Sequence, residues 1–144
     1  MAITKSSGRQ ELIEAKADFA FGDLTSGTAV AAIDLPRYAR ILKVYLRIET
    51  AFNSATTDAL IVQSNESTPK AYITIGAAQN SLPISKVWST DPTLSGTASS
   101  NVGFVNPNPS TLDIKWTGVG AITTGAATLL VEYVVANRAE FTQG

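Results

Sequence analysis

The side chains of this chain that could do acid–base chemistry are carboxylates, and they are widely spaced. Asp34, Asp58, Asp91 and Asp113 fall in different loops and predicted strands. A glycosidase needs two carboxyl groups across one sugar bond, and these spacings neither require nor exclude such a pair. A short carboxylate also satisfies the amides of a turn, and we expect that role for Asp34 and Asp58. The chain has no Asp-x-Asp-x-Asp-Gly loop, so the sequence predicts no calcium site of that type.

Histidine and cysteine are both absent from the chain. The usual nitrogen and sulfur ligands of zinc and copper are therefore missing, and no disulfide can form. The commonest general base and the strongest nucleophile are missing as well. Gly118 and Gly120 are not followed by the Gly-Lys-Ser/Thr that completes a phosphate-binding loop. We expect no enzyme activity, no metal and no cofactor.

Five aromatic residues could instead bind a ligand, because an aromatic ring stacks on the flat face of a sugar. They are Tyr38, Tyr45, Tyr72, Trp88 and Trp116. The other interpretation is ordinary packing, with Trp116 in a core and Trp88 at the edge of a sheet. The sequence favours packing and leaves a sugar-binding groove as the alternative.

The composition indicates one folded domain over residues 1–144. Hydrophobic residues make up 44% of the chain and charged residues only 16%, against about 25% in a typical domain. The net charge is −1, which gives no reason to expect nucleic-acid binding. The first residues lack the apolar stretch of a signal peptide, and no run approaches the roughly 20 apolar residues of a membrane span. We expect a protein that is made in the cytoplasm and is not inserted in a membrane.

Alternation of apolar and polar residues predicts the strands that position these side chains. Residues 9–21 place one set inward (Ile13, Ala15, Ala17, Phe19 and Phe21) and the charged set outward (Glu14, Lys16 and Asp18). A helical face of Leu12, Ala15 and Phe19 is the alternative for this segment. A second strand over 28–35 ends at Pro36, and a third over 40–50 turns Leu42, Val44, Leu46 and Ile48 inward.

Further strands are predicted over 58–64, 71–75 with Gly76 as its stop, 85–89, 102–105, 112–116 and 127–135. Leu112, Ile114 and Trp116 face inward, and Asp113 and Lys115 face outward. The 127–135 strand is apolar on both faces, so it is either central in a sheet or covered by a partner chain. Residues 91–101 form a long loop, and residues 106–109 (Asn-Pro-Asn-Pro) a turn. The sequence therefore predicts an all-β fold, an antiparallel β-sandwich or jelly roll of about eight strands.

The two ends of the chain, residues 1–8 and 137–144, are small, polar and sparsely charged. Such ends are poorly ordered alone unless something ties them down. We interpret them as an extended N-terminal arm and a C-terminal tail that neighbouring chains hold in place.

One stretch of the sequence resembles a known family. The segments Ala32-Ile33-Asp34-Leu35-Pro36 and 51–62 (Ala-Phe-Asn-Ser-Ala-Thr-Thr-Asp-Ala-Leu-Ile-Val) resemble small virion proteins of tailed bacteriophages. Among these, the chain is most similar to the jelly-roll cement or decoration proteins on the capsids of short-tailed phages, such as the Bordetella phage. The resemblance covers about a quarter of the chain and rests on structural residues.

The resemblance implies a structural virion protein on the capsid exterior that cements neighbouring major capsid subunits against the pressure of internal DNA. It implies the major capsid protein and a second copy, as dimer or trimer, as partners, with the 127–135 strand as one surface for self-association. Arg9, Arg37, Tyr38, Arg138 and Phe141 are the expected contacts, because Arg supplies forked hydrogen bonds and aromatic rings supply buried area. The alternatives are a tail or fibre module that binds a host glycan, and a carboxylate-based glycan hydrolase on a jelly roll.

Overall fold

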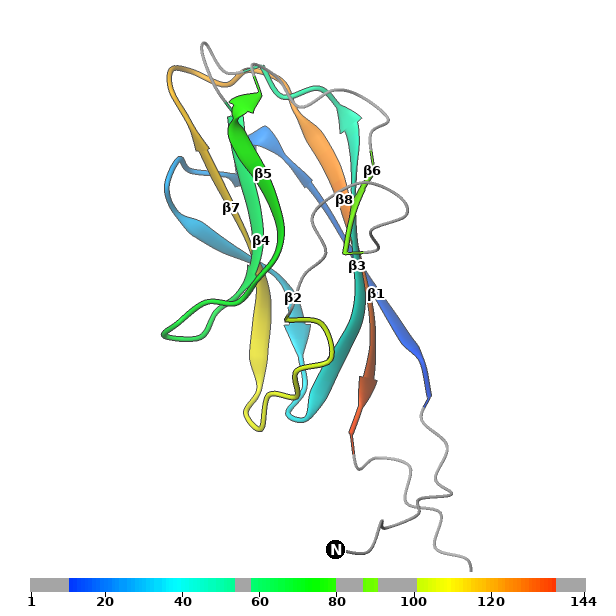
Figure 1. Ribbon diagram of the computed structural model, residues 1–144. Coiled ribbons are helices and arrows are strands. Elements are labelled where there is room, and N and C mark those ends of the chain that lie inside the picture. Colours follow the sequence, from blue (N-terminus) through cyan, green and yellow to red (C-terminus); the bar gives the residue numbers. More distant parts are fainter. Residues whose placement is uncertain (1–10, 54–57, 80–86, 91–100, 137–144) are drawn as a thin grey trace, which may run out of the picture.

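The chain forms two four-stranded antiparallel sheets packed face to face (Figure 1). The computed structural model describes residues 11–53, 58–79, 87–90 and 101–136. The predicted all-β sandwich of jelly-roll type is confirmed, and the predicted arms lie outside the described residues. The elements are β1 (Ile13–Ala20), a 3-10 turn (Phe21–Asp23), β2 (Ala29–Leu35), β3 (Ala39–Thr50), β4 (Asp58–Ser64), β5 (Ala71–Gln79), β6 (Val87–Ser89), β7 (Ser110–Gly118) and β8 (Ala126–Val135).

The strand order is β1-β8-β3-β6 in one sheet, the β8 sheet, and β2-β7-β4-β5 in the other, the β7 sheet. β8 therefore lies between β1 and β3. Of the two explanations for its apolar faces, a central place in a sheet or a covering partner chain, the structure agrees with the first. Strands β1 and β2 are edge strands on the same side of the sandwich. The alternation predicted for the first strand is present, with Glu14, Lys16 and Asp18 exposed, so the helical alternative is wrong.

The core lies between the two sheets and uses the inward residues that alternation predicts. Fully buried side chains come from β3, β4, β7 and β8, and include Val44, Leu46, Ile48, Leu60, Val62, Leu112, Leu129 and Val131. Burying each such side chain stabilises the fold by about 1.5–3 kcal/mol. Trp116 and Trp88 are also buried, at 3% and 5% exposure.

One inward position of β3 differs from the prediction. The register of β3 against β8 shifts between Ile41 and Lys43, which marks a bulge. The extra residue reverses the alternation, so Ile41 is buried at 3% exposure and Leu42 is only half-buried. A strict period of two cannot reveal such a bulge, because both residues are apolar.

Two other predictions about strands are wrong in detail. Gly76 does not end β5, because the ladder shifts from Leu60↔Ile75 to Asp58↔Gln79 and accommodates the glycine in an irregularity. Residues 102–105 form a turn with a single bridge, from Arg40 to Val105. A loop carries these residues across the end of the sandwich, so they have no neighbouring strand to extend along.

Two side chains have a different exposure from the one predicted. Asp113 is buried at 8% exposure, because β7 lies inside its sheet and the Thr111 hydroxyl donates a hydrogen bond to the Asp113 carboxylate at 2.5 Å. Phe21 is 36% exposed, because the strand ends at Ala20 and Phe21 begins the 3-10 turn.

The end of the sandwich that holds the turn after β1 is fixed by a polar and an apolar contact. The Asn53 side-chain oxygen accepts hydrogen bonds from the amides of Thr123 and Thr124, at 3.0 and 2.8 Å, and its amide donates to the Thr123 hydroxyl at 2.8 Å. Gly125 has a φ of +146°, and a Cβ there would lie 2.4 Å from the ring of Phe52. The loop after β7 is therefore tied to the end of β3.

Candidate functional site

The predicted contact residues that the structure describes lie at the opposite end of the sandwich. β1 and β3 begin there, and β2 and β8 end there (Figure 1). We call this region the Tyr38 corner and define it as residues 36–39, the 101–109 loop and Ala136. Three segments that are far apart in the sequence meet in it.

Tyr38 has an unusual backbone at this corner. It is the one residue other than glycine with a positive φ, +64°, in the part of the chain that the structure describes. Two hydrogen bonds fix it, because its amide donates to the Asn106 carbonyl at 2.7 Å and its carbonyl accepts from the Ala136 amide at 2.8 Å. The left-handed conformation costs a residue with a side chain about 1–2 kcal/mol. Glycine avoids this cost, so a tyrosine here indicates a use for its ring.

Arg37 lies against the same ring and is exposed. Its guanidinium carbon is 5.0 Å from the centroid of the Tyr38 ring, a cation–π geometry. Its Nε donates to the Pro107 carbonyl at 3.3 Å. These contacts hold Arg37 and Tyr38 side by side, and their role as contacts with a partner stays a prediction.

The 101–109 loop joins the two sheets at this corner. The side-chain amide of Asn101 donates to the Ala71 carbonyl in β5 at 2.8 Å, and the amide of Gly103 donates to the Ile41 carbonyl in β3 at 2.8 Å. Each sheet contributes an acceptor, so the loop crosses the open end of the sandwich and is anchored on both sides.

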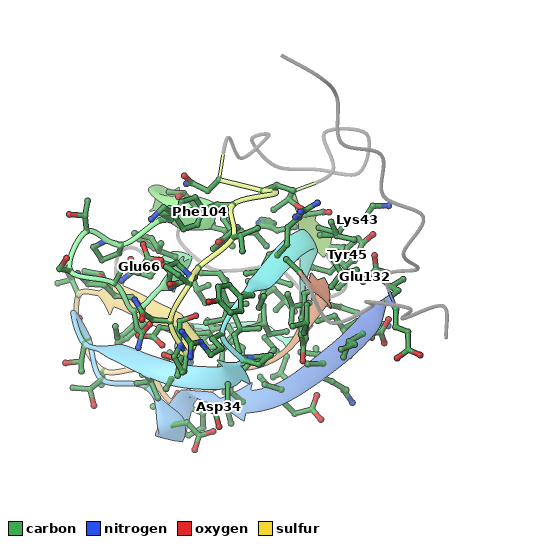
Figure 2. The ribbon with its side chains drawn as sticks, turned by 90° about the horizontal axis from the view of Figure 1, so that it is seen from below. Asp34, Lys43, Tyr45, Glu66, Phe104 and Glu132 are labelled. Atoms are coloured by element: carbon green, nitrogen blue, oxygen red, sulfur yellow. The ribbon has the colours of Figure 1, made fainter. Side chains whose placement is uncertain are left out.

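A charged cluster supports this loop from the β4–β5 turn. Glu66 pairs with Lys70 and accepts a hydrogen bond from the Asn106 side chain at 2.8 Å. The Lys70 ammonium lies 4.0 Å from the centroid of the Phe104 ring, which remains 43% exposed. Figure 2 looks at this end and shows Glu66 and Phe104 on the same side. Burial, with a smaller contribution from the charge of Glu66, raises the pKa of Tyr72 to about 12.

The corner is a packed surface and not a ligand pocket. The cavity beneath the loop has a volume of about 10 Å³ and is lined by residues that include Leu35, Ile41, Tyr72 and Ser110. That volume is at or below what one water molecule needs. The side chains that a partner could contact at this corner are therefore the outer ones, above all Arg37, the half-buried Tyr38 and Phe104.

The outward face of the β8 sheet carries a second set of polar and aromatic side chains. Lys43 lies opposite Glu132, and Tyr45 opposite Leu130, in the ladder of β3 and β8. Figure 2 shows Lys43, Tyr45 and Glu132 gathered on one side of the molecule. Cross-strand pairs of opposite charge stabilise a sheet modestly, so this face is explained by the fold alone.

The structure brings together two of the five predicted contact residues, Arg37 and Tyr38. Arg9, Arg138 and Phe141 lie outside the described residues and remain predictions. The chain reaches β1 through Leu12, which is 59% exposed, and leaves β8 at Ala136 beside Tyr38. Both predicted arms are therefore attached at the end of the sandwich that carries the Tyr38 corner.

Phe104, Lys70 and Asn106 were not predicted from the sequence as parts of this surface. The turn predicted over 106–109 was the available signal, because its two asparagines and two prolines fix a bend. The Asn106 side chain does accept from the Asn108 amide at 3.0 Å. The sequence of residues 106–109 alone does not reveal which strands this turn packs against.

Most of the residues considered for sugar binding and acid–base chemistry lie outside the Tyr38 corner. Tyr72, Trp88 and Trp116 are buried in the core at 3–5% exposure, so packing is the correct interpretation for them. Asp34 is exposed on β2, and Asp91 lies outside the described residues. Within the described ranges, no three acidic, histidine or cysteine side chains are close enough to share a metal ion. No helix in those ranges has the length and apolar character to cross a bilayer.

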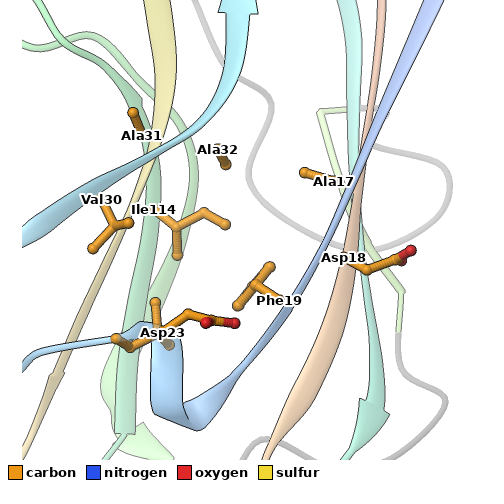
Figure 3. A pocket seen from close by; sticks show the side chains of 9 residues that line it. Ala17, Asp18, Phe19, Asp23, Val30, Ala31, Ala32 and Ile114 are labelled. Carbon is orange, nitrogen blue, oxygen red and sulfur yellow. The ribbon is translucent and has the colours of Figure 1, made fainter.

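A hollow between β1 and β2 has a volume of about 330 Å³ (Figure 3). Its lining is mainly small and apolar, with Ala17, Phe19, Val30 and Ile114 among the residues. The carboxylate of Asp18 points to the other side of β1. A few convergent polar groups normally orient a ligand, and this hollow has no such set.

Comparison with solved structures finds the same fold in phage capsids. A chain in the structure of the cyanophage Pam1 capsid asymmetric unit superposes with a TM-score of 0.61 at 20% identity, covering 94% of this chain and 91% of that one. A chain of the Ralstonia phage GP4 capsid gives 0.56 at 13% identity, covering 93% and 90%. A chain of the acid-stable capsid of Helicobacter pylori bacteriophage KHP30 gives 0.55 at 17% identity, covering 88% and 93%. No family model and no curated protein sequence matches the chain.

Proposed function

We propose that this chain is a structural component of a tailed-bacteriophage particle that binds the outside of the shell and cements neighbouring major capsid subunits against DNA pressure. One observation carries the proposal: the fold recurs in three phage capsid structures along about nine-tenths of both chains. The domain therefore serves in those capsids as a chain of nearly this length, and not as a module of a much longer one.

The Tyr38 corner is the surface that we assign to the shell. An interface needs a few anchors of large area or forked hydrogen bonding, and Tyr38 and Arg37 are residues of those types. The loop contacts fix both before binding, so little side-chain freedom is lost on docking. Phe104 adds exposed apolar area beside them.

The predicted arms, residues 1–8 and 137–144, extend the same contact in this proposal. Since both are attached beside the corner, the corner and the arms can contact neighbouring subunits at the same time. Two or more weak contacts made by one molecule raise the overall affinity without any single strong site. A glycan-binding role is less well supported, because three of its five aromatic residues are core residues.

The test uses expanded shells of the parent phage that lack this protein. Purified full-length chain is added, and its copy number per shell and the temperature at which packaged DNA is released are measured. We expect saturable occupancy of many equivalent lattice positions and a higher release temperature. Binding at a few positions only, or occupancy without a change in release temperature, contradicts cementing.

Variants then locate the contact. Arg37→Ala should lower occupancy, whereas Arg47→Ala, at an exposed arginine of β3 in an ion pair with Glu49, serves as the matched control. Deletion of 138–144 tests the tail, which includes Arg138 and Phe141, and Arg9→Ala tests the N-terminal arm. Unchanged occupancy in all of these would show that the contact lies elsewhere on the molecule.

A further inference from the structure

Of the four edge strands in the described sandwich, β1 alone is both long and regular. β6 has three residues, and the ladders of β2 and β5 each contain a register shift. β1 runs over eight residues without a shift, a proline or a bulge. Proteins usually shorten, bend or block an exposed edge, because its free amides and carbonyls pair with any other strand. β1 therefore has the length and regularity that allow an edge strand to pair with another strand.

The backbone groups at this edge can be assigned from one hydrogen bond. The Phe21 amide donates to the Gly125 carbonyl at 2.9 Å, and the two residues continue the β1–β8 register. Because hydrogen bonding alternates along an antiparallel pair, the odd-numbered residues of β1 bond to β8. The amides and carbonyls of Glu14, Lys16 and Asp18 therefore point to the free edge. The next outward amide, of Ala20, donates to the Asp23 carboxylate at 2.9 Å, which closes the edge there.

The charges at this edge have the order acid, base, acid. We propose that β1 is a self-association edge: two copies pair through β1, antiparallel, about a two-fold axis at Ala17, and join their β8 sheets into one eight-stranded sheet. In this register Lys16 of each copy lies opposite Asp18 of the other. Lys16 and Asp18 both have backbone amides and carbonyls that point to the free edge. Each Lys16–Asp18 pair between the two copies can therefore form two backbone hydrogen bonds and places unlike charges opposite each other.

The inward side chains select the same register. Pairing about Ala17 places Phe19 of one copy against Ala15 of the other, so a large side chain faces a small one beside the hollow between β1 and β2. Pairing about Lys16 would oppose Glu14 to Asp18 and Lys16 to itself, and like charges directly opposite are unfavourable. Pairing about Ala15 would place Phe19 opposite Glu11, beyond the start of the strand.

The mass of the full-length chain in solution, measured against concentration, tests the association. We expect a dimer whose dissociation constant rises about tenfold for Lys16→Asp or for Asp18→Lys, because each change places like charges together at two symmetric positions. The double variant that carries both changes restores the unlike pairs and should restore the dimer. A chain that stays monomeric at every concentration overturns the proposal, as does a double variant weaker than both single variants.

The register has a separate test, because the chain contains no cysteine. In Ala17→Cys the two thiols face each other across the axis, within the range that a disulfide spans, and mild oxidation should link the copies. In Ala15→Cys, the matched control, the thiols are four residues apart along the strands, about 13 Å, and should not link. Linking of Ala15→Cys but not of Ala17→Cys would overturn the proposed axis.

Discussion

Replacing Tyr38 separates the effect of its left-handed backbone on stability from the role of its ring in binding the shell. We consider two variants, Tyr38→Ala and Tyr38→Gly, which both remove the ring. Alanine retains a Cβ and with it the unfavourable left-handed conformation, whereas glycine adopts a φ of +64° without strain. The two backbone hydrogen bonds of Tyr38, to Asn106 and Ala136, remain possible in both.

The expected stabilities follow from these contacts. Both variants lose the cation–π contact with Arg37, which at an exposed site contributes about 0.5–1 kcal/mol. The glycine variant recovers about 1–2 kcal/mol of conformational strain and loses about 0.5–1 kcal/mol through its freer unfolded chain. We therefore expect Tyr38→Gly to be close to the original protein in its free energy of unfolding. Tyr38→Ala should be about 1 kcal/mol less stable.

Urea denaturation of the full-length chain measures the stability of each variant, and occupancy on shells that lack the protein measures binding. Both variants should lose occupancy equally, although one of them is as stable as the original protein. Equal stability of the two variants would refute the argument that Tyr38 is strained. Normal occupancy of Tyr38→Gly would refute the assignment of its ring to the contact.

Three further changes test other parts of the structure. Gly125→Ala places a Cβ against Phe52 and should lower the free energy of unfolding by about 2–4 kcal/mol in thermal denaturation, whereas Gly76→Ala, with open space around it, should change it by less than about 1 kcal/mol. Asn53→Ala removes three hydrogen bonds to the loop after β7 and should cost about 1–2 kcal/mol, and Asn53→Asp, which keeps the acceptor, should retain most of that stability. Because burial raises the pKa of Tyr72 from 10.0 to about 12, its contribution is complete below pH 10 and is lost as the pH rises through 12. Tyr72→Phe should therefore flatten the fall in stability between pH 10 and 12, and an unchanged slope there would contradict the raised pKa.

The strands were predictable because period-two alternation reflects burial on one face. β1 has the alternation expected of it, and Leu112, Ile114 and Trp116 of β7 are in the core as predicted. The bulge at Ile41 was not predictable, since either of two adjacent apolar residues could face inward. Asp113 is buried because β7 lies inside its sheet, and the order of strands in a sheet cannot be read from one strand's own sequence.

The Tyr38 corner was predictable only in part, for a related reason. Arg37 and Tyr38 were chosen for their chemistry, and they are adjacent in the chain. Their partners in the corner are not: Arg37 bonds to Pro107, seventy residues away. The left-handed backbone of Tyr38 depends on those distant contacts, because a tyrosine by itself favours a negative φ. Strain of this kind becomes visible only when the segments that impose it are in place.

The corner and the β1 edge are compatible with one assembly, because they use different parts of the sandwich. β1 begins at the corner end, and antiparallel pairing about Ala17 points the corners of two copies in opposite directions. A dimer would therefore present two Tyr38 corners, one at each end of a continuous sheet, while each edge is covered by the other copy. A molecule with two separated contacts can join two shell positions, whereas a monomer with one corner joins only the subunits within reach of that corner and its arms. A variant that no longer dimerises but still binds the shell would argue against bridging by a dimer and would leave the role of the Tyr38 corner intact. The proposal for the β1 edge and the proposal for the corner can therefore fail independently.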